Sequence, residues 1–379
     1  MAIARVNRRR FLGCSAAAGL AFTQGELAEA AAASDPVRLG VIGAGGRGTA
    51  LIRALVEIPG VQITAVCDPV DRHRDRALGV IEKAAGARPA GLDDDRRLLD
   101  RADVDAVAIA LPCDLHEPMN LAALAAGKHV YAEKPLGLSL PECDRLIAMA
   151  DAHRGLVVHV GFQRRSNPRF REGVERIRQG ELGALIEARA SWTSGNGPLM
   201  GHDGWLARRA RSGDWMVEQA VHIWDVLLWL KGSPPESAVG WGRRDLFAAL
   251  DPGRDVTDHY SVELQWADGF RASFVQSWVA PADQAFTGST LRVMGEAGGL
   301  DFGSGSLTFR DRGRPRETLR PGIHPDTRLA LAAFIEAIHD GSRAAPITLA
   351  QARLATKVGL MARQAVDLGR RVSFAECEA

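Results

Sequence analysis

The stretch VRLGVIGAGGRG at residues 37–48 decides the fold, because an apolar run passes there into a Gly-x-Gly-x-x-Gly turn. In such a turn the first glycine permits a sharp bend after a strand, the second lets the backbone approach a pyrophosphate, and the third lets the next helix pack closely on the sheet. A pyrophosphate then lies at a helix N-terminus, where unpaired N–H groups and the helix dipole favour anions. The sequence therefore predicts a dinucleotide site at Gly43, Ala44, Gly45, Gly46, Arg47 and Gly48.

A second strand is predicted at Val61–Cys67, and Asp68 follows it, twenty residues after the last glycine of the turn. A carboxylate at this place accepts hydrogen bonds from both hydroxyls of an adenosine ribose and repels the 2′-phosphate of NADP. The spacing therefore favours NAD as the cofactor, with NADP less favoured. The alternative is a glycine-rich turn without a ligand, because the glycine pattern alone is a weak signal.

The composition is that of a globular protein with a small-molecule partner. The 379 residues are 46% hydrophobic, enough for a large core and two domains. Lys and Arg number 47 against 46 Asp and Glu, and no basic block occurs beyond the N-terminal segment, so neither nucleic acid nor an anionic membrane is the expected partner. No segment after residue 33 reaches the ~18 apolar residues of a membrane span.

The N-terminal segment has its own character. The residues NRRRFL at 7–12 precede a mildly apolar stretch and a run of small residues that ends at Ala33. This order predicts a twin-arginine export signal over residues 1–33, and therefore a periplasmic protein. The alternative is a disordered, alanine-rich tail.

Two domains are predicted after that segment. Strand and helix patterns alternate over residues 34–161, with a continuous apolar run at Ala106–Leu111 that is typical of a parallel strand buried on both faces. This is the pattern of an α/β fold, a Rossmann doubly wound parallel sheet. Longer alternating strands over residues 162–345 predict an α+β domain with a large open, mostly antiparallel sheet. In residues 346–379, a helix over Leu349–Leu368 is expected to pack back on the Rossmann domain.

The motif Glu133-Lys134-Pro135 follows the fifth predicted strand, at the carboxyl edge where open α/β sheets bind their ligands. A lysine there can donate a hydrogen bond to a reacting hydroxyl and stabilise the alkoxide that develops. The alternative is a solvated turn that the proline holds in place.

A second group of polar residues lies in an apolar segment, Gly213–Leu230, that reads as one helix. Glu218, His222 and Asp225 are spaced four and three residues apart, which places them along one face of such a helix. Histidine can take a hydroxyl proton near neutral pH, and a neighbouring carboxylate fixes its tautomer. The alternatives are a core histidine with two satisfied acids or, less favoured by this spacing, a metal ligand set. We expect no metal, because no Cys/His cluster indicates one.

The chain resembles the Gfo/Idh/MocA oxidoreductases, the family of glucose-fructose oxidoreductase and inositol dehydrogenase, over nearly all of the sequence after residue 33. The motifs that carry the resemblance are the turn at Gly43, Leu111-Pro112 with His116, Glu133-Lys134-Pro135, Gly161-Phe162-Gln163-Arg164-Arg165 with Pro168, Gly180-Glu181-Leu182-Gly183 and His222-Ile223-Trp224-Asp225. Inositol dehydrogenases commonly have an aspartate four residues before the histidine, where this chain has Glu218. This difference leaves the identity of the substrate open.

The resemblance implies oxidation of a secondary hydroxyl of a sugar, glycoside or cyclitol, with hydride transfer to NAD. His222 would accept the hydroxyl proton, Lys134 would stabilise the oxyanion, and Glu218 would orient His222. The implied substrate contacts are His222, Arg165 and Asp225, and Asp225 alternatively locks its helix. Cofactor contacts beyond the glycine turn and Asp68 are implied for Pro112, His116, Glu133, Lys134 and Gln163. The family's open second sheet further implies a homo-oligomer.

Two other functions stay open. Some relatives use bound NAD to oxidise a glycoside, eliminate and hydrate it, and then reduce it, which gives net hydrolysis without consuming cofactor. Such a site needs one more base, for which Tyr131, His202 or Glu218 are candidates. A protein that binds a sugar or NAD without catalysis is the second alternative. A twin-arginine signal also exports a folded protein away from the soluble NAD pool, so we expect the cofactor to be tightly bound and recycled in place.

Overall fold

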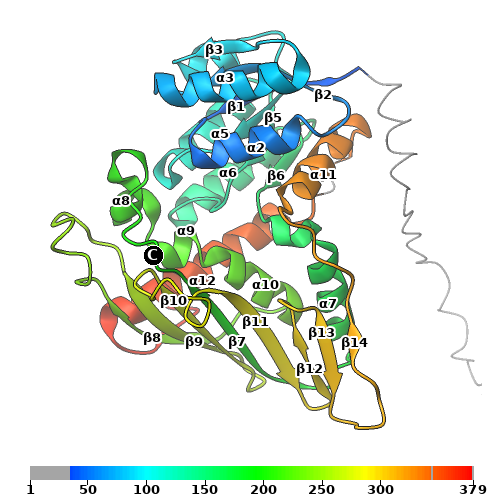
Figure 1. Ribbon diagram of the computed structural model, residues 1–379, viewed down its shortest axis with the longest axis vertical. Coiled ribbons are helices and arrows are strands. Elements are labelled where there is room, and N and C mark those ends of the chain that lie inside the picture. The colour runs from blue at the N-terminus through cyan, green and yellow to red at the C-terminus, as the bar shows by residue number, and fades with distance from the viewer. Residues whose placement is uncertain (1–34, 343–344, 378–379) are drawn as a thin grey trace, which may run out of the picture.

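The computed structural model describes residues 35–342 and 345–377, and Figure 1 shows two lobes. The predicted twin-arginine segment, residues 1–33, lies outside the described residues. Each lobe is built on one sheet, and the two sheets have six and nine strands. This confirms the predicted fold class, a doubly wound parallel sheet followed by an α+β part with a large sheet.

The first sheet has the strand order β3-β2-β1-β4-β5-β6, and every neighbouring pair is parallel. Its strands are β1 (Val37–Ile42), β2 (Val61–Cys67), β3 (Ala90–Leu92), β4 (Ala106–Ile109), β5 (His129–Ala132) and β6 (Val158–Val160). β2 has the predicted bounds, and β1 covers the apolar run before the glycine turn. β4 is two residues shorter than predicted, because Ala110 makes the last bond to β1 and the chain then turns into a 3₁₀ helix.

Helices cover both faces of this sheet, as the buried apolar strands require. They are α2 (Gly46–Leu55), α3 (Asp71–Ala85), α4 (Asp95–Leu99), η1 (Cys113–Leu115), α5 (His116–Ala125), α6 (Leu140–Ala152) and η2 (Gln163–Ser166). Local signals fix their ends: the Ser139 hydroxyl accepts a hydrogen bond from the Glu142 amide at the start of α6, and Gly86 ends α3 at a φ of 72°.

The second sheet has the order β14-β13-β12-β11-β7-β10-β9-β8-β15. Its strands are β7 (Leu185–Thr193), β8 (Ser237–Arg243), β9 (His259–Gln265), β10 (Arg271–Ser277), β11 (Gly288–Gly295), β12 (Gly298–Asp301), β13 (Ser306–Phe309), β14 (Glu317–Thr318) and β15 (Val372–Ser373). Among the described strands of this second sheet, only β7 and β10 pair in parallel, and all the other neighbouring pairs are antiparallel.

The remaining helices lie mainly between the two sheets (Figure 1). They are α7 (Pro168–Arg178), η3 (His202–Ala207), α8 (Arg209–Ser212), α9 (Trp215–Glu218), α10 (Val221–Lys231), α11 (Thr327–His339) and α12 (Leu349–Leu368). The bounds of α12 are those predicted from the sequence. Thr348 and Gln351 form a capping box at its start, and Gly369 follows its end at a φ of 62°.

Two segments pack differently from the predicted division of the chain. Helix α11, within residues 162–345, packs against α2, β1 and β5 of the Rossmann lobe. Strand β15, within residues 346–379, pairs with β8 at the edge of the second sheet. Helix α12 contacts α6 and β6 as well as α9, α10 and β8, so it joins the two lobes rather than packing on the first alone.

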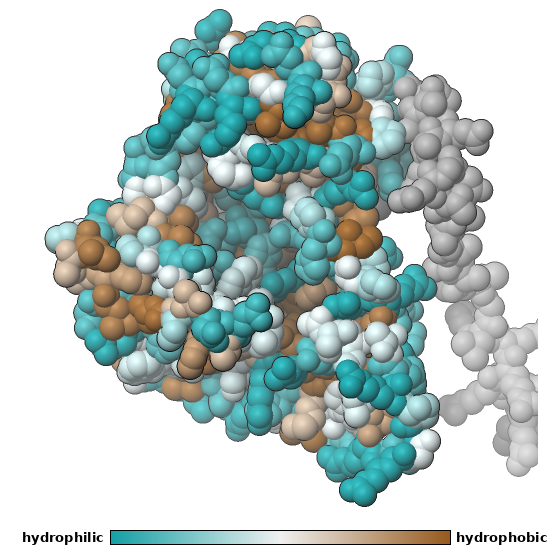
Figure 2. Space-filling view, in the orientation of Figure 1, coloured by the Kyte–Doolittle hydropathy of each residue, from teal (hydrophilic) through white to brown (hydrophobic). Residues whose placement is uncertain are grey.

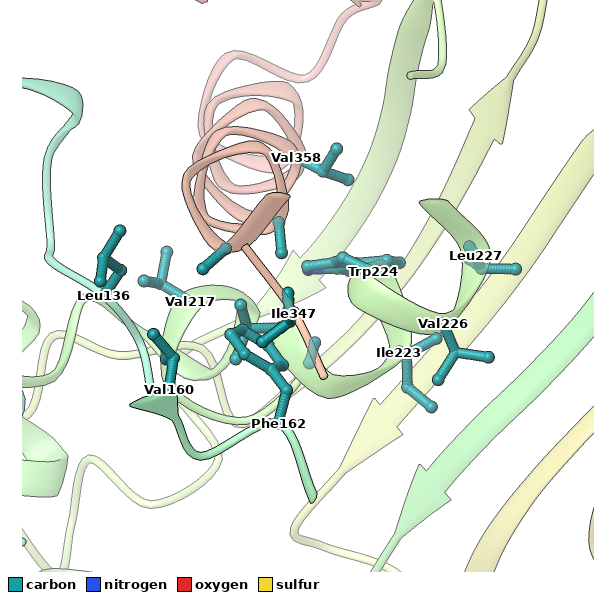
Figure 3. Close-up of a cluster of buried hydrophobic side chains, with 14 of the residues drawn as sticks. Leu136, Val160, Phe162, Val217, Ile223, Trp224, Val226, Leu227, Ile347 and Val358 are labelled. Atoms are coloured by element: carbon teal, nitrogen blue, oxygen red, sulfur yellow. The ribbon is translucent and has the colours of Figure 1, made fainter. Parts of the chain in front are cut away.

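One hydrophobic cluster runs through both lobes (Figure 3). Leu136 and Val160 of the Rossmann lobe belong to the same buried cluster as Val217, Trp224 and Val358, which come from α9, α10 and α12. Burial of this apolar surface is the main force that holds the lobes together. The site between the lobes therefore has a rigid base.

Candidate active site

The glycine turn has the geometry that the sequence predicts. Gly43 has a φ of 87°, and a Cβ added there would lie 2.3 Å from the carbonyl oxygen of Ala110. A Cβ on Gly48 would lie 1.9 Å from the carbonyl oxygen of Gly43, so only glycine lets α2 approach β1 this closely. A Cβ on Gly45 or Gly46 would meet nothing within 4 Å. Gly43 and Gly48 are thus required by the fold, whereas Gly45 and Gly46 border open space next to the turn.

Asp68 supports this turn from the end of β2. One carboxylate oxygen accepts a hydrogen bond from the Ala44 amide at 2.7 Å, and the other accepts one from the Val70 amide at 2.9 Å. Beside it lies a cavity of about 520 Å³ at the carboxyl ends of β1 to β4. Its lining includes Gly43, Cys67, Leu111 and Met119, which supply apolar surface of the kind that holds an adenine ring.

The residues present fit a dinucleotide. No side chain caps the N-terminus of α2, where Gly45 is the N-cap, so its first amides are available to a pyrophosphate. The amide oxygen of Gln163 is buried without a hydrogen-bond partner among the described residues. A bound amide or hydroxyl donor would satisfy it. No cluster of three or more metal-ligating side chains occurs in residues 35–342 and 345–377.

Glu133 and Arg47 form an ion pair at the end of β5. The Arg47 guanidinium donates from Nε to a Glu133 carboxylate oxygen at 2.8 Å and from Nη1 to the Thr327 hydroxyl at 3.1 Å. The pair therefore joins the glycine turn to β5 and to α11. Because its guanidinium is bonded to Glu133 and Thr327, the Arg47 side chain supports the glycine turn from within the protein.

Lys134 points from the Rossmann lobe to the second lobe. Its ammonium donates to the carboxylate of Glu218 at 2.7 Å and to the Glu218 carbonyl oxygen at 2.6 Å. Burial disfavours the charge, but the Glu218 carboxylate outweighs burial, so the pKa of Lys134 is raised above its ordinary value. Lys134 is therefore a fixed cation at the interface of the two lobes.

His222 lies close to this cation with its ring between aromatic side chains. The ring centroids of Phe162 and Trp192 are 6.0 and 6.3 Å from that of His222, and the histidine is 7% exposed. Burial, assisted by the charges of Lys134 and Arg164, holds the pKa of His222 well below its usual value. The imidazole is therefore neutral at neutral pH and able to accept a proton.

The predicted role of Glu218 as the residue that orients His222 is wrong, because the predicted single helix over Gly213–Leu230 is broken. Helix α9 ends at Glu218, and the amide of Ala220 bonds back to the carbonyl of Trp215 at 2.8 Å, a five-residue span typical of a π-turn. The extra residue rotates α10 relative to α9, and no hydrogen bond joins Glu218 to His222 in the described structure. Glu218 orients Lys134 instead.

Arg165 and Asp225 face each other in the interior. Their side chains are 4% and 1% exposed, and the guanidinium donates to the carboxylate from Nη2 at 2.6 Å and from Nε at 3.0 Å. Arg165 also stacks over the ring of Trp229 at 4.7 Å. Each of the two charges is paired with the other in this buried ion pair, which joins α10 to η2. This pairing corrects the expected roles of Arg165 and Asp225 as substrate contacts.

Arg164 has a different environment from its neighbour. Its guanidinium lies over the rings of Trp192 at 5.2 Å and Phe170 at 5.6 Å, with no carboxylate within ion-pair distance among the described residues. Burial lowers the pKa of Arg164 to about 10, and its Nη1 has no hydrogen-bond partner in the described structure. It is a cation beside His222 with donor capacity to spare.

His116 and Pro112 lie in the segment that follows β4, on either side of η1. The ring nitrogens of His116 face the carbonyl oxygens of Pro135 at 2.8 Å and Leu111 at 2.9 Å. Burial lowers the pKa of His116. A neutral imidazole carries one N–H, so His116 donates to one of these two carbonyl oxygens and its other nitrogen lies against the second. Both ring nitrogens therefore face the backbone at the ends of β4 and β5, which corrects the expected contact of His116 with the cofactor. Pro112 precedes η1 in the same loop.

Sequence reasoning missed Gln219, which a buried chain of hydrogen bonds connects to the second sheet. The Tyr260 hydroxyl donates to the side-chain oxygen Oε1 of Gln276 at 2.6 Å, and the side-chain nitrogen Nε2 of Gln276 donates to Oε1 of Gln219. Tyr260 is fully buried and burial raises its pKa, so its proton needs this acceptor, which fixes the direction of the chain. The amide nitrogen of Gln219 is therefore left with two donors beside Glu218 and His222. No local signal marks Gln219, because Gln276 lies 57 residues away in sequence.

The fold and this site define an NAD-binding oxidoreductase. Residues 37–162 match the family described as "Oxidoreductase family, NAD-binding Rossmann fold", and residues 170–301 match the GFO/IDH/MocA C-terminal domain. The chain belongs to the Gfo/Idh/MocA oxidoreductase family.

Curated relatives carry two kinds of name. An inositol 2-dehydrogenase of Saccharopolyspora erythraea is 35% identical over 196 residues, which are 51% of this chain and 53% of that protein. A glycosyl hydrolase family 109 protein of the same organism is 39% identical over 126 residues, which are 32% of this chain and 28% of that protein. The chain thus matches about a quarter to a half of the length of these relatives.

Solved structures share the fold over nearly the whole chain. The myo-inositol 2-dehydrogenase of Lactobacillus plantarum has a TM-score of 0.73 at 24% identity, covering 89% of this chain and 99% of that one. The scyllo-inositol dehydrogenase of Lactobacillus casei, solved with NAD(H) and scyllo-inositol, has a TM-score of 0.73 at 21% identity, covering 90% of this chain and 100% of that one.

Proposed function

We propose that this protein is an NAD-dependent dehydrogenase that oxidises a secondary hydroxyl of a sugar, glycoside or cyclitol. The observation that carries the proposal is the meeting of Lys134, Glu218 and His222 between the glycine turn and the second sheet. The inositol dehydrogenases among the relatives support the substrate class. NAD is preferred to NADP because the Asp68 carboxylate stands at the end of β2.

The site residues divide the work of removing a hydride. When bound, NAD supplies the hydride acceptor. His222, neutral because of its surroundings, accepts the proton of the reacting hydroxyl. The ammonium of Lys134 donates a hydrogen bond to the same oxygen and stabilises the negative charge that develops there. Glu218 fixes the position of that ammonium, and the Gln219 amide donates to a second oxygen of the substrate.

Export and oligomerisation complete the proposal. The twin-arginine motif at residues 7–12 supports transport of the folded protein to the periplasm, with the cofactor retained and recycled. A homo-oligomer through the second sheet is supported by apolar side chains on its outer face, where Trp241 and Met294 are 57% and 44% exposed. No helix in the described part of the chain combines the length and hydropathy of a membrane span.

Purified protein without residues 1–33 tests the proposal. It is mixed with NAD and a panel of cyclitols and sugars that includes myo-inositol, scyllo-inositol and glucose, and formation of NADH is followed. The proposal predicts NADH with at least one cyclitol or sugar. Matched protein carrying Lys134→Met, which keeps the length of the side chain but removes the charge, should bind NAD equally and form NADH about 10³-fold more slowly.

A second candidate, the NAD-dependent glycoside hydrolase cycle, is favoured by the family 109 relatives. The structure contradicts Tyr131 as one of its candidate bases. The Tyr131 side chain is 1% exposed and packs on Phe334 of α11, and burial raises its pKa so far that the hydroxyl stays protonated. Glu218 lies beside Lys134, and His202 lies in η3. Aryl glycosides with no added cofactor decide between the candidates, because release of the aryl alcohol without net NADH supports the cycle. Tightly bound NAD with neither activity would favour binding alone.

A further inference from the structure

A segment of the second lobe crosses the carboxyl edge of the Rossmann sheet. Residues 201–212, called the crossing segment here, comprise η3 and α8 and connect the end of β7 to α9. Helix α8, at the left of Figure 1, contacts both η1 of the Rossmann lobe and α9, and Figure 2 shows a hollow between the two lobes. Cofactor binding, proposed above, takes place at this edge of the sheet.

Two contacts attach the crossing segment to the Rossmann lobe. The ring of His202 meets the ring of His73 edge to face, with centroids 5.2 Å apart, and His73 Nδ1 lies 3.6 Å from the carboxylate of Asp68. At the other end, the Arg211 guanidinium donates to the Asp114 carboxylate at 3.2 Å. The side chains of Arg211 and Asp114 are 34% and 27% exposed, so this ion pair is partly shielded from water.

The strand order shows what lies between these contacts. Asp68 follows β2, the glycine turn follows β1, and Asp114 lies in η1 after β4; these strands are neighbours in the order β2-β1-β4. Parallel strands end at the same edge, so a segment that touches the ends of β2 and β4 passes over the end of β1. The crossing segment therefore spans the glycine turn from the side of the second lobe.

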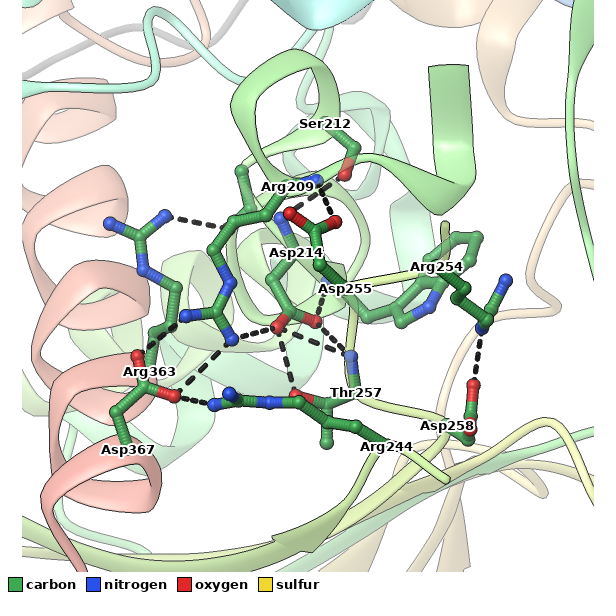
Figure 4. Close-up of polar contacts among 12 residues, drawn as sticks. Arg209, Ser212, Asp214, Arg244, Arg254, Asp255, Thr257, Asp258, Arg363 and Asp367 are labelled. Atoms are coloured by element: carbon green, nitrogen blue, oxygen red, sulfur yellow. Dashed lines mark hydrogen bonds and ion pairs between the residues drawn. The ribbon is translucent and has the colours of Figure 1, made fainter. Parts of the chain in front are cut away.

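The crossing segment is held firmly by the second lobe (Figure 4). Arg209 donates to Asp214 at 3.0 Å and to Asp367 of α12 at 2.7 Å, and its amide donates to Asp255 at 2.6 Å. Asp214 is fully buried and also accepts from the Thr257 hydroxyl at 2.8 Å. A segment anchored in this way does not swing aside alone, so its contacts with the Rossmann lobe act between the two lobes.

We propose that the crossing segment completes the dinucleotide site, and that its contacts through His202 and Arg211 set how slowly the cofactor leaves. This inference rests on the proposed binding of NAD. The ligand class is a dinucleotide whose pyrophosphate lies between the glycine turn and this segment.

Dissociation of NADH from the purified protein tests the inference, measured by displacement with excess NAD in a stopped-flow fluorimeter. Arg211→Asp places two carboxylates together and should speed dissociation about tenfold. Asp114→Arg should do the same, and the double variant, which restores an ion pair in the reverse sense, should return to within about twofold of the parent rate. His202→Ala should speed dissociation about two- to fivefold.

Arg88→Asp is the matched control, because it removes an arginine that pairs with Glu82 on the outer surface of α3 and lies outside the crossing segment. Its dissociation rate should equal that of the parent. NADH that binds and leaves at the parent rate in both Arg211→Asp and His202→Ala overturns the inference. A double variant as fast as Asp114→Arg also overturns it, since Asp114 would then act on the cofactor directly. A parent protein that binds no NADH overturns the proposed function itself.

Discussion

The cofactor end and the substrate end of the site are built in different ways. At the cofactor end, a contiguous turn of six residues contains the glycines that shape it, and a single carboxylate from the next strand supports it. At the substrate end, Lys134, Gln219 and His222 come from both lobes. Lys134 and Gln219 are held by partners 84 and 57 residues away, Glu218 and Gln276. The comparison teaches that the shape of the glycine turn is a local property of the chain, whereas the chemistry and the closure of the site depend on how the lobes pack.

The largest effect is expected at the lobe interface. Lys134→Met removes the only side-chain partner of Glu218 in the described structure and the charge that stabilises the oxyanion. We expect kcat to fall about 10³-fold while the affinity for NAD changes little. Steady-state kinetics and NAD titration measure the two quantities separately. Equal losses in kcat and in NAD affinity would mean that Lys134 belongs to the cofactor end.

His222→Asn should lower kcat about 10²-fold, because the general base is lost while the size of the side chain is nearly kept. In the parent protein, the acid limb of kcat/KM should lie below the ordinary imidazole pKa of about 6.5, since the pKa of His222 is lowered. An acid limb of kcat/KM whose midpoint lies above pH about 6.5 in the parent protein would contradict this assignment.

The same shift affects stability. A histidine with a lowered pKa stays neutral when folded and gains a proton on unfolding below pH about 6.5, so the free energy of unfolding should decrease as the pH falls through that value. His222→Asn should make this decrease smaller. Denaturant unfolding of the two proteins between pH 5 and pH 8 measures it, and identical slopes would contradict the neutral state of His222.

Two glycines separate folding from binding at the cofactor end. Gly48→Ala should destabilise the fold by about 1–3 kcal/mol, because its Cβ would lie 1.9 Å from the Gly43 carbonyl oxygen. Gly45→Ala meets open space at a φ of −61°, so it should keep the stability of the parent and weaken NAD binding about tenfold. Thermal unfolding and NAD titration distinguish them. Loss of stability without loss of binding at Gly45 would mean that no ligand approaches the turn.

The smallest effect is expected from the hydrogen-bond chain behind Gln219. Tyr260→Phe removes the donor that fixes the direction of the chain, so the Gln219 amide loses its preferred orientation. KM for the substrate should rise about two- to tenfold with kcat nearly unchanged. Gln219→Leu should raise KM at least as much, and a kcat loss in either variant would place Gln219 at the reacting hydroxyl instead.

The sequence was sufficient for the fold class and the cofactor turn, because glycine geometry, apolar runs and helix caps act over a few residues. The bounds of β2 and of α12 were predicted correctly for this reason. The break between α9 and α10 was not predicted, because the apolar pattern continues through a π-turn that contains one residue more than an ordinary helical turn. Long-range partners decided the roles of Glu218, Arg165 and Asp225, and no local spacing contains that information.

The most direct test of the account is native mass spectrometry of the purified protein, followed by analysis of the small molecules that it releases on denaturation. The account predicts NAD or NADH bound to the folded chain, and retention of that cofactor through dilution. Protein that releases no nicotinamide cofactor and binds no added NAD would contradict it.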